Sequence, residues 1–102
     1  MATVSEAFAL AVQHHQAGQF QAVQQICDQI LASQPDHADA MHLLGVTASQ
    51  SGNRELAVSY IQRAIAVKDT DPAFHSNLGV ILKELGQLDE AAACCRHALQ
   101  NF

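Results

Sequence analysis

Histidine and cysteine are the residues of this chain best suited to chemistry, because both can ligate metals and both can act as bases or nucleophiles. The 102-residue sequence contains six histidines and three cysteines. A two-histidine metal site on a helix needs imidazoles four residues apart. No two histidines have this spacing, and His14 and His15 are adjacent. We therefore predict no metal site and no cofactor, and we interpret the histidines as surface or rim residues.

The cysteines give no stronger sign of catalysis. Cys27, Cys94 and Cys95 are odd in number, lack metal-ligand spacing and lie in stretches of helical periodicity. A nucleophilic thiol needs a base beside it in a cleft. On a helix, Cys95 does not point toward His97, nor Cys27 toward Asp28. We predict reduced, mostly buried thiols in a reducing compartment, and a chain that is not an enzyme.

Composition restricts the remaining classes of protein. Apolar residues make up 49% of the chain, aromatic residues only 5%, and tryptophan is absent, which is a composition typical of helices. The formal charge of −5, with scattered Lys and Arg, disfavours binding to nucleic acid or to an anionic membrane. No segment approaches the roughly 18 apolar residues of a membrane span, and the N-terminus does not resemble a signal peptide. We expect a soluble, cytoplasmic protein with one domain over residues 1–102.

The elements that would position these residues follow from an internal repeat of 34 residues. At this shift, residues of one size class align throughout the chain. The aligned triplets are Leu10, Leu44 and Leu78; Ala11, Gly45 and Gly79; Val12, Val46 and Val80; Gly18, Gly52 and Gly86; Val23, Ala57 and Ala91; Cys27, Ile61 and Cys95; Ile30, Ala64 and Ala98; and Leu31, Ile65 and Leu99.

Each unit reads as a helical hairpin, because two runs with apolar spacings of three and four residues flank the central glycine. In the first unit these runs are Ala7, Leu10, Ala11, His14 and Phe20, Val23, Cys27, Ile30. The glycine would end the first helix in a left-handed conformation, and Gln19, Asn53 and Gln87 would open the turn. Helix starts are indicated by Thr3 with Glu6, by Asp36 after Pro35, and by Asp71 before Pro72.

We therefore predict an all-α fold of three tandem helix-turn-helix repeats. The repeats span about 4–37, 38–71 and 72–102, and the six helices about 4–17, 20–33, 37–51, 54–68, 72–85 and 88–101. Small residues let the two arms of each hairpin approach, with Ala11, Gly45 and Gly79 facing Val23, Ala57 and Ala91. A Gly45→Leu substitution should destabilise the fold by at least the roughly 1 to 3 kcal/mol of overpacking.

These features resemble the tetratricopeptide repeat family. The shared features are the period, the Leu-Gly pairs at Leu44-Gly45 and Leu78-Gly79, the mid-unit glycine and a proline at the unit boundary. The chain departs from the family in having Ala7, Met41 and His75 where a bulky aromatic is usual, and Ala11 in place of glycine. The resemblance implies a right-handed α-solenoid whose first helices line a concave groove for a protein or peptide partner.

On this resemblance the groove would be lined by Phe8, Val12, His15, Gln16, His42, Leu43, Val46, Gln50, Asn77, Val80, Lys83 and Glu84. The three valines have two interpretations, contact with a ligand or packing between neighbouring first helices. Asn77 matches the asparagine by which family members hold a peptide backbone, but Ala9 and Leu43 interrupt the ladder. Since Lys83 is the one cation on this face, carboxylate clamping is disfavoured. His15 and His42 could make the groove's charge respond between about pH 6 and 7.

Two alternatives to groove binding follow from the sequence. A repeat array normally ends with a polar capping helix, whereas Leu88, Ala91, Cys95, Ala98, Leu99 and Phe102 form an apolar stripe. This stripe, especially Leu88, Cys95, Leu99 and Phe102, predicts either truncation from a longer array or self-association as a homodimer. The segments HADAMHLLGV and PAFHSNLGV are also similar to repeats that precede sugar-transferase domains of the O-linked N-acetylglucosamine transferase type. That similarity implies a substrate-recruiting region of a larger enzyme.

Overall fold

The structure, a computed structural model, describes residues 3–87, 90, 93–94 and 96–97. Within these residues the chain forms five helices and no strand: α1 (Val4–Gln16), α2 (Phe20–Ser33), α3 (Ala38–Gln50), α4 (Arg54–Val67) and α5 (Pro72–Glu84). The predicted all-α repeat fold is confirmed, and these five helices agree with the predicted ranges to within one residue at each end. The sixth expected helix falls largely outside the described residues, although those described beyond residue 89 are helical.

The helix starts show how local chemistry sets these boundaries. Thr3 and Glu6 form the predicted capping box, each backbone N–H donating to the other residue's side chain at 3.1 Å. Asp71 accepts from the backbone N–H of Ala73 at 2.9 Å, with Pro72 as the first helical residue. These two predicted starts are confirmed.

The predicted cap of the third helix is wrong, because the cap is His37 and not Asp36. The helix begins one residue later than predicted, at Ala38, so its N-cap position falls on His37. There the ring nitrogen Nδ1 of His37 accepts from the backbone N–H of Ala40 at 3.0 Å.

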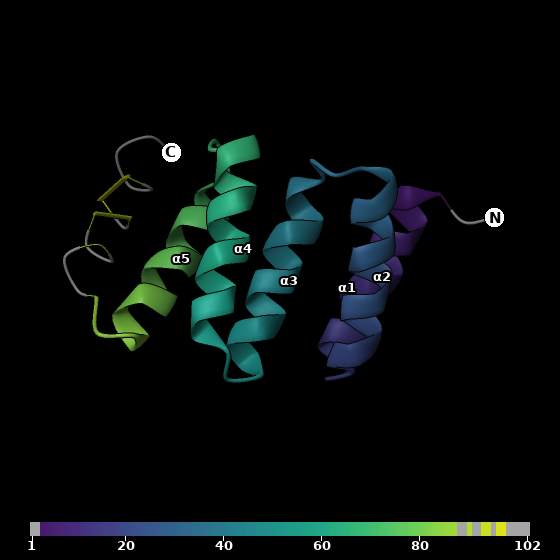
Figure 1. The fold of residues 1–102 in the computed structure, drawn as a ribbon, viewed down its shortest axis with the longest axis horizontal. Helices are drawn as coiled ribbons and strands as arrows, with labels where there is room; N and C mark the ends of the chain where they lie inside the picture. Colours follow the sequence, from purple (N-terminus) through teal and green to yellow (C-terminus); the bar gives the residue numbers. More distant parts are fainter. Residues whose placement is uncertain (1–2, 88–89, 91–92, 95, 98–102) are drawn as a thin grey trace.

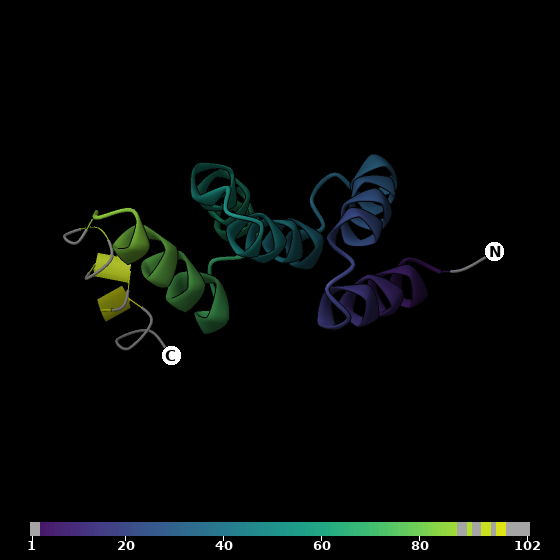
Figure 2. The same cartoon turned by 90° about the horizontal axis from the view of Figure 1, so that it is seen from below.

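The helices alternate between two layers. Figure 1 shows α2, α3, α4 and α5 following one another across the view, with α1 behind α2, and Figure 2 shows α1, α3 and α5 along one side with α2 and α4 along the other. Gly18, Gly52 and Gly86 have φ angles of 76°, 93° and 82°, which confirms the left-handed glycine after each first helix. The connections are therefore tight enough for α1 to pack on α2 and for α3 to pack on α4.

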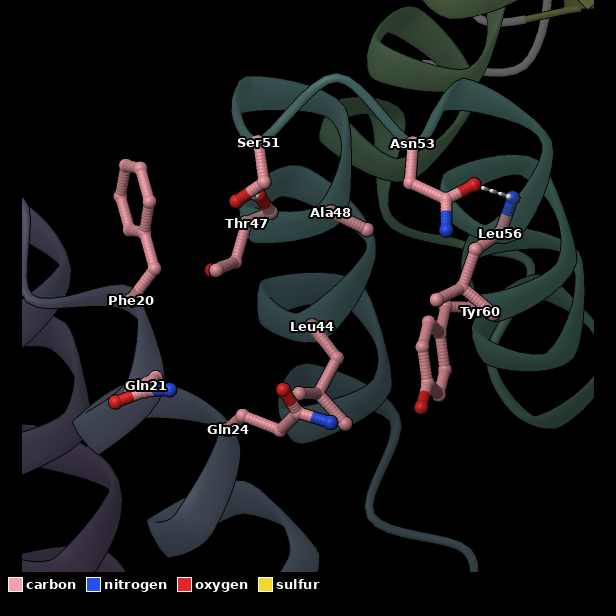
Figure 3. Close-up of a pocket in the computed structure, with 10 residues that line it drawn as sticks. All are labelled: Phe20, Gln21, Gln24, Leu44, Thr47, Ala48, Ser51, Asn53, Leu56 and Tyr60. Atoms are coloured by element: carbon pink, nitrogen blue, oxygen red, sulfur yellow. Dashed lines mark hydrogen bonds between the residues drawn. The ribbon is translucent and has the colours of Figure 1, made fainter.

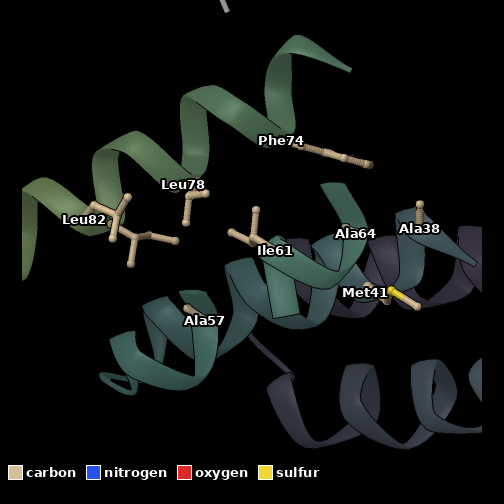
Figure 4. Packing of buried hydrophobic residues seen from close by; sticks show 9 residues of the cluster. Ala38, Met41, Ala57, Ile61, Ala64, Phe74, Leu78 and Leu82 are labelled. Carbon is tan, nitrogen blue, oxygen red and sulfur yellow. The ribbon is translucent and has the colours of Figure 1, made fainter. Parts of the chain in front are cut away.

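Two hydrophobic clusters hold the layers together, and α3 contributes to both. The first core cluster joins α1, α2 and α3 through Ala11, Val23, Cys27, Ile30, Ala40, Leu43 and Leu44. The second core cluster joins α3, α4 and α5 through Ala38, Met41, Ala57, Ile61, Ala64, Phe74, Leu78, Ile81 and Leu82 (Figure 4). As a result α3 is buried on most of its circumference.

Close approach of α3 and α4 depends on Gly45, as predicted. A Cβ atom on Gly45 would lie 2.5 Å from Cγ1 of Ile61 and 3.1 Å from the carbonyl oxygen of Ala57. The corresponding pair Ala11 and Val23 is fully buried in the first core cluster. Gly79 is buried too, but its expected neighbour Ala91 lies outside the described residues.

One repeat position differs in burial between the units. Leu10 aligns with Leu44 and Leu78, yet it is 47% exposed whereas they are 3% and 5% exposed. Leu44 packs in the first core cluster with α2, and Leu78 in the second with α4. In the part of the chain that the structure describes, no helix covers the equivalent side of α1.

Candidate functional site

A depression lies between α3 and α5, the two first helices of adjacent repeats, on the side of the molecule predicted to bind a partner. It has a volume of about 160 Å³ and is lined by Val46, Ser49, Gln50, Asn77, Val80, Ile81 and Glu84. We refer to it as the α3–α5 depression. It brings together five of the predicted groove residues, namely Val46, Gln50, Asn77, Val80 and Glu84.

The repeated valines differ in how much solvent they meet. Val80 is 55% exposed, which makes it the most exposed of the large hydrophobic residues described. Val46 is half-buried beside it, and Val12 packs partly against the first core cluster. The three valines therefore do not share one interpretation, because Val12 packs against the core whereas Val80 is open to solvent.

A polar contact joins α3 to α5 next to the depression. The side-chain amide N–H of Asn77 donates to Nε2 of His42 at 2.8 Å. The ring of His42 also stacks on the ring of Phe74, with centroids 4.6 Å apart and an angle of 29° between the planes. Because Nε2 accepts, the imidazole is neutral and carries its proton on Nδ1. His42 therefore couples two repeats through Asn77, which also lines the depression.

The environment of His42 alters its titration. Burial lowers the pKa of this imidazole below its usual 6.5, and the carboxylates of Asp71 and Asp39 partly offset the effect. The predicted response of the groove through His42 would consequently occur at a more acidic pH than that of an ordinary histidine.

One ion pair involves Glu84, which lines the depression. Nε of Arg54 on α4 lies 2.9 Å from Oε2 of Glu84 on α5, and both side chains are about two-fifths exposed, at 41% and 40%. Such exposed pairs contribute little stability, typically below about 1 kcal/mol. The pair still offsets the negative charge of Glu84, so the depression is close to neutral. Lys83 is exposed on the same helix but does not line the depression.

The prediction that Leu43 lines the groove is wrong, because this residue is only 8% exposed and belongs to the first core cluster. Leu43 is buried because the core face of α3 is broad, since this helix packs on α1 and α2 as well as on α4 and α5.

The predicted residues of α1 do not line the depression. Phe8 packs partly on the first core cluster with its ring 5.5 Å from that of His37, and His15 lies beside Phe20 with ring centroids 6.0 Å apart. Gln16 is exposed at the end of the helix. Sequence reasoning missed Ile81, which also lines the depression although it is 3% exposed. Its position four residues after Asn77 was the available signal.

Cys27 is a poor nucleophile in this structure. Burial, together with the neighbouring carboxylate of Asp28, raises the pKa of the Cys27 thiol to about 11. Among the described residues, no group of three or more His, Cys, Asp and Glu side chains could hold a metal ion. Within the same part of the chain, no helix is long and apolar enough to cross a membrane. The residues proposed for self-association, Leu88, Cys95, Leu99 and Phe102, lie outside the described residues.

Comparison with known proteins identifies the repeat. A family model described as tetratricopeptide repeat matches residues 14–76, and a second with the same description matches residues 72–102. The UDP-N-acetylglucosamine–peptide N-acetylglucosaminyltransferase of Caenorhabditis elegans is 30% identical over 89 residues, which are 87% of this chain and 8% of that protein. This chain therefore spans only a small part of that relative.

Solved structures show the same arrangement of helices. An O-GlcNAc transferase mutant from Thermobaculum terrenum matches with a TM-score of 0.90 and 30% identity, over 98% of this chain and 20% of that one. The type III secretion translocator chaperone SycD of Yersinia enterocolitica matches with a TM-score of 0.89 and 18% identity, over 96% of this chain and 73% of that one. At such low identity the second match speaks for the fold alone.

Proposed function

Since this chain belongs to the tetratricopeptide repeat family, we propose that it is a protein-interaction module that binds a peptide or helix of a partner protein in the α3–α5 depression. The observation that carries this proposal is the exposure of Val80. An apolar side chain that is 55% exposed on the wall of a concave depression is stabilised when a ligand covers it.

The size of this contribution can be worked from the exposed area. Complete burial of a valine side chain is worth about 1.5 to 3 kcal/mol, so covering roughly half of it is worth about 1 kcal/mol. By the relation between free energy and affinity, this corresponds to about a fivefold change in Kd. Val46 beside it extends the apolar surface.

Polar groups around the valines are suited to a peptide backbone. Ser49 and Gln50 contribute a hydroxyl and an amide from α3, and Asn77 contributes its Oδ1 oxygen from α5. A bound segment would place an apolar side chain between the two valines and donate backbone N–H groups to these oxygens. Because Arg54 offsets Glu84, the central residues of this segment would be uncharged.

The proposal is tested by selecting binders from a displayed random peptide library on the immobilised chain and measuring the enriched peptides by calorimetry. Val80→Ser should weaken them about fivefold, because it removes the apolar contact. Val67→Ser is the matched control, since Val67 is 48% exposed near the end of α4 and does not line the depression. Equal affinity for the parent and both variants would reject the α3–α5 depression as the binding site.

A second proposal concerns the larger protein context. The Caenorhabditis elegans relative and the solved O-GlcNAc transferase structure are each 30% identical to this chain in sequence. This similarity favours a role as the substrate-recruiting repeat region of a sugar transferase. In that case the partner segment would be the protein substrate of the enzyme. Sequencing the source gene beyond codon 102 tests this idea. A transferase domain in the same reading frame would support it, and an immediate stop codon would contradict it.

A further inference from the structure

A second and larger depression opens on the opposite face of α3, between α2 and α4 (Figure 3). Its volume is about 240 Å³. We refer to it as the α2–α4 pocket. Leu44 and Ala48 of α3 contribute apolar surface at its centre, Phe20 of α2 lies on one side, and Leu56 and Tyr60 of α4 lie on the other. The separation of the two depressions follows from helix geometry, because residues 44, 47, 48 and 51 share one face of α3 whereas residues 46, 49 and 50 share the other.

Thr47 provides a polar group that the fold does not use. The residue is 5% exposed, and its Oγ1 is buried with no hydrogen-bond partner. Its neighbour Ser51 instead donates its own hydroxyl to the backbone carbonyl of Thr47 at 2.9 Å. Figure 3 shows the Thr47 side chain extended from α3 toward the α2 side of the pocket. Buried hydroxyls are nearly always satisfied, so this one calls for a partner from outside the chain.

The pocket is electrically neutral in an otherwise acidic chain. None of its ten lining residues is Asp, Glu, Lys, Arg or His, although the sequence has ten acidic and five basic residues. The other lining residues, Gln21, Gln24, Ser51 and Asn53, carry amides and a hydroxyl around the apolar centre. A charged occupant would lose its hydration without gaining a counter-ion, so the pocket selects a neutral one.

We propose that the α2–α4 pocket binds the side chain of a tyrosine or tryptophan from a partner protein. A cavity of about 150 Å³ holds benzene, so 240 Å³ accommodates an aromatic ring with a polar substituent. The ring would cover Leu56, which is 41% exposed, and pack against Phe20 and Tyr60. Because Oγ1 of Thr47 is itself covered, a rotation of this side chain toward the pocket would bring it within reach of the ring's hydroxyl or indole N–H, which would form the hydrogen bond that Thr47 lacks.

This surface is separate from the α3–α5 depression and can be occupied at the same time. The chain would then contact a partner on both layers of helices. Aromatic anchors of this kind supply a large share of the binding free energy in protein interfaces.

The test uses small probes with a ¹⁵N-labelled chain, followed by nuclear magnetic resonance. The probe p-cresol represents the tyrosine side chain, 3-methylindole represents tryptophan, and toluene is the control without a polar group. We expect saturable shifts of the amides of Thr47, Leu56 and Tyr60, with a Kd on the order of 1 mM for so small a ligand. N-acetyltyrosinamide should bind at least as tightly as p-cresol, because the backbone would remain outside the pocket.

Two variants and one control make the test specific. Thr47→Val keeps the shape of the side chain and removes the hydroxyl, so it should weaken p-cresol about fivefold and leave toluene unweakened. Leu56→Ser lies on the exposed side of the pocket and should weaken all three probes. Val80→Ser, on the opposite face, should alter none of them.

Some outcomes would overturn the proposal. Absence of saturable shifts would show that the pocket does not take aromatic groups. If Thr47→Val changed the Kd of p-cresol and that of toluene equally, the proposed hydrogen bond to Thr47 would be ruled out. Exclusion of N-acetyltyrosinamide with retention of p-cresol would mean that the pocket takes a free small molecule and not a protein side chain.

Discussion

Replacing Gly45 with alanine should destabilise the fold, although alanine is the better helix former. In an exposed helix interior, Gly→Ala stabilises by up to about 1 kcal/mol. Here the new methyl group would meet Cγ1 of Ile61 at 2.5 Å and the backbone oxygen of Ala57 at 3.1 Å. Both distances are shorter than ordinary van der Waals contact, so the sign of the effect depends on whether these neighbours can move.

The surroundings oppose such movement. Ile61 and Ala57 are both 0% exposed, so Ile61 has no solvent-facing space to rotate into, and the Ala57 oxygen belongs to the α4 backbone. Overpacking a filled core costs about 1 to 3 kcal/mol. With the propensity gain subtracted and the upper part of this range applied, we expect a net loss of about 1 to 2 kcal/mol. Gly45→Leu should cost more.

Thermal and urea unfolding followed by circular dichroism would measure this loss. For a chain of this size, about 1 kcal/mol lowers Tm by roughly 4 to 8 °C. The same substitution in an Ile61→Ala background serves as the control, because that background removes the nearest clashing atom and the penalty should shrink. If Gly45→Ala melted at or above the parent temperature, the idea that this contact sets the spacing of α3 and α4 would be refuted.

Four further predictions concern individual residues. Asn53→Ala should destabilise the fold by about 1 kcal/mol in urea unfolding, because Oδ1 of Asn53 caps α4 by accepting from the backbone N–H of Leu56 at 3.3 Å. Gln19→Ala should destabilise the fold less, because the side chain of Gln19 makes no cap hydrogen bond to α2. Cys27, with its pKa raised to about 11, should react with iodoacetamide at pH 8 far more slowly than in the urea-unfolded chain, as a mass-spectrometric time course would show. The lowered pKa of His42 means that the folded state binds its proton less readily than the unfolded state. The contribution of neutral His42 to the free energy of unfolding is therefore fully present above about pH 6.5 and is lost as the pH falls through the pKa of the folded state. His42→Gln should flatten this pH dependence of stability in urea titrations between pH 7.5 and 5. If the C-terminal stripe mediates self-association, sedimentation equilibrium should give a concentration-dependent mass for the parent and a monomer for Leu99→Lys.

Much of the fold could be predicted because its determinants are local and repeated. The positive-φ glycines, the capping box at Thr3 and the proline start at Pro72 each act within a few residues. The 34-residue period then carries the same arrangement from one unit to the next. The cap at His37 was missed because a shift of one residue transfers the capping position to a different side chain.

The candidate site was less predictable because it depends on distances between helices that are not neighbours in sequence. Periodicity indicates which face of α3 is apolar, but not that Leu43 turns inward while Val46 remains accessible. The contact between His42 and Asn77 spans 35 residues, and no local pattern distinguishes it from two independent polar side chains.

The α2–α4 pocket shows why the same small residues govern both stability and binding. Its two sides belong to α2 and α4, which are held apart by α3. Gly45 sets how closely α4 approaches α3, and α4 carries Leu56 and Tyr60. A methyl group at Gly45 that displaced α4 would therefore also move these two residues away from Thr47. Because packing and pocket geometry share one contact, Gly45→Ala should weaken the aromatic probes of the α2–α4 pocket even at temperatures where the variant is fully folded.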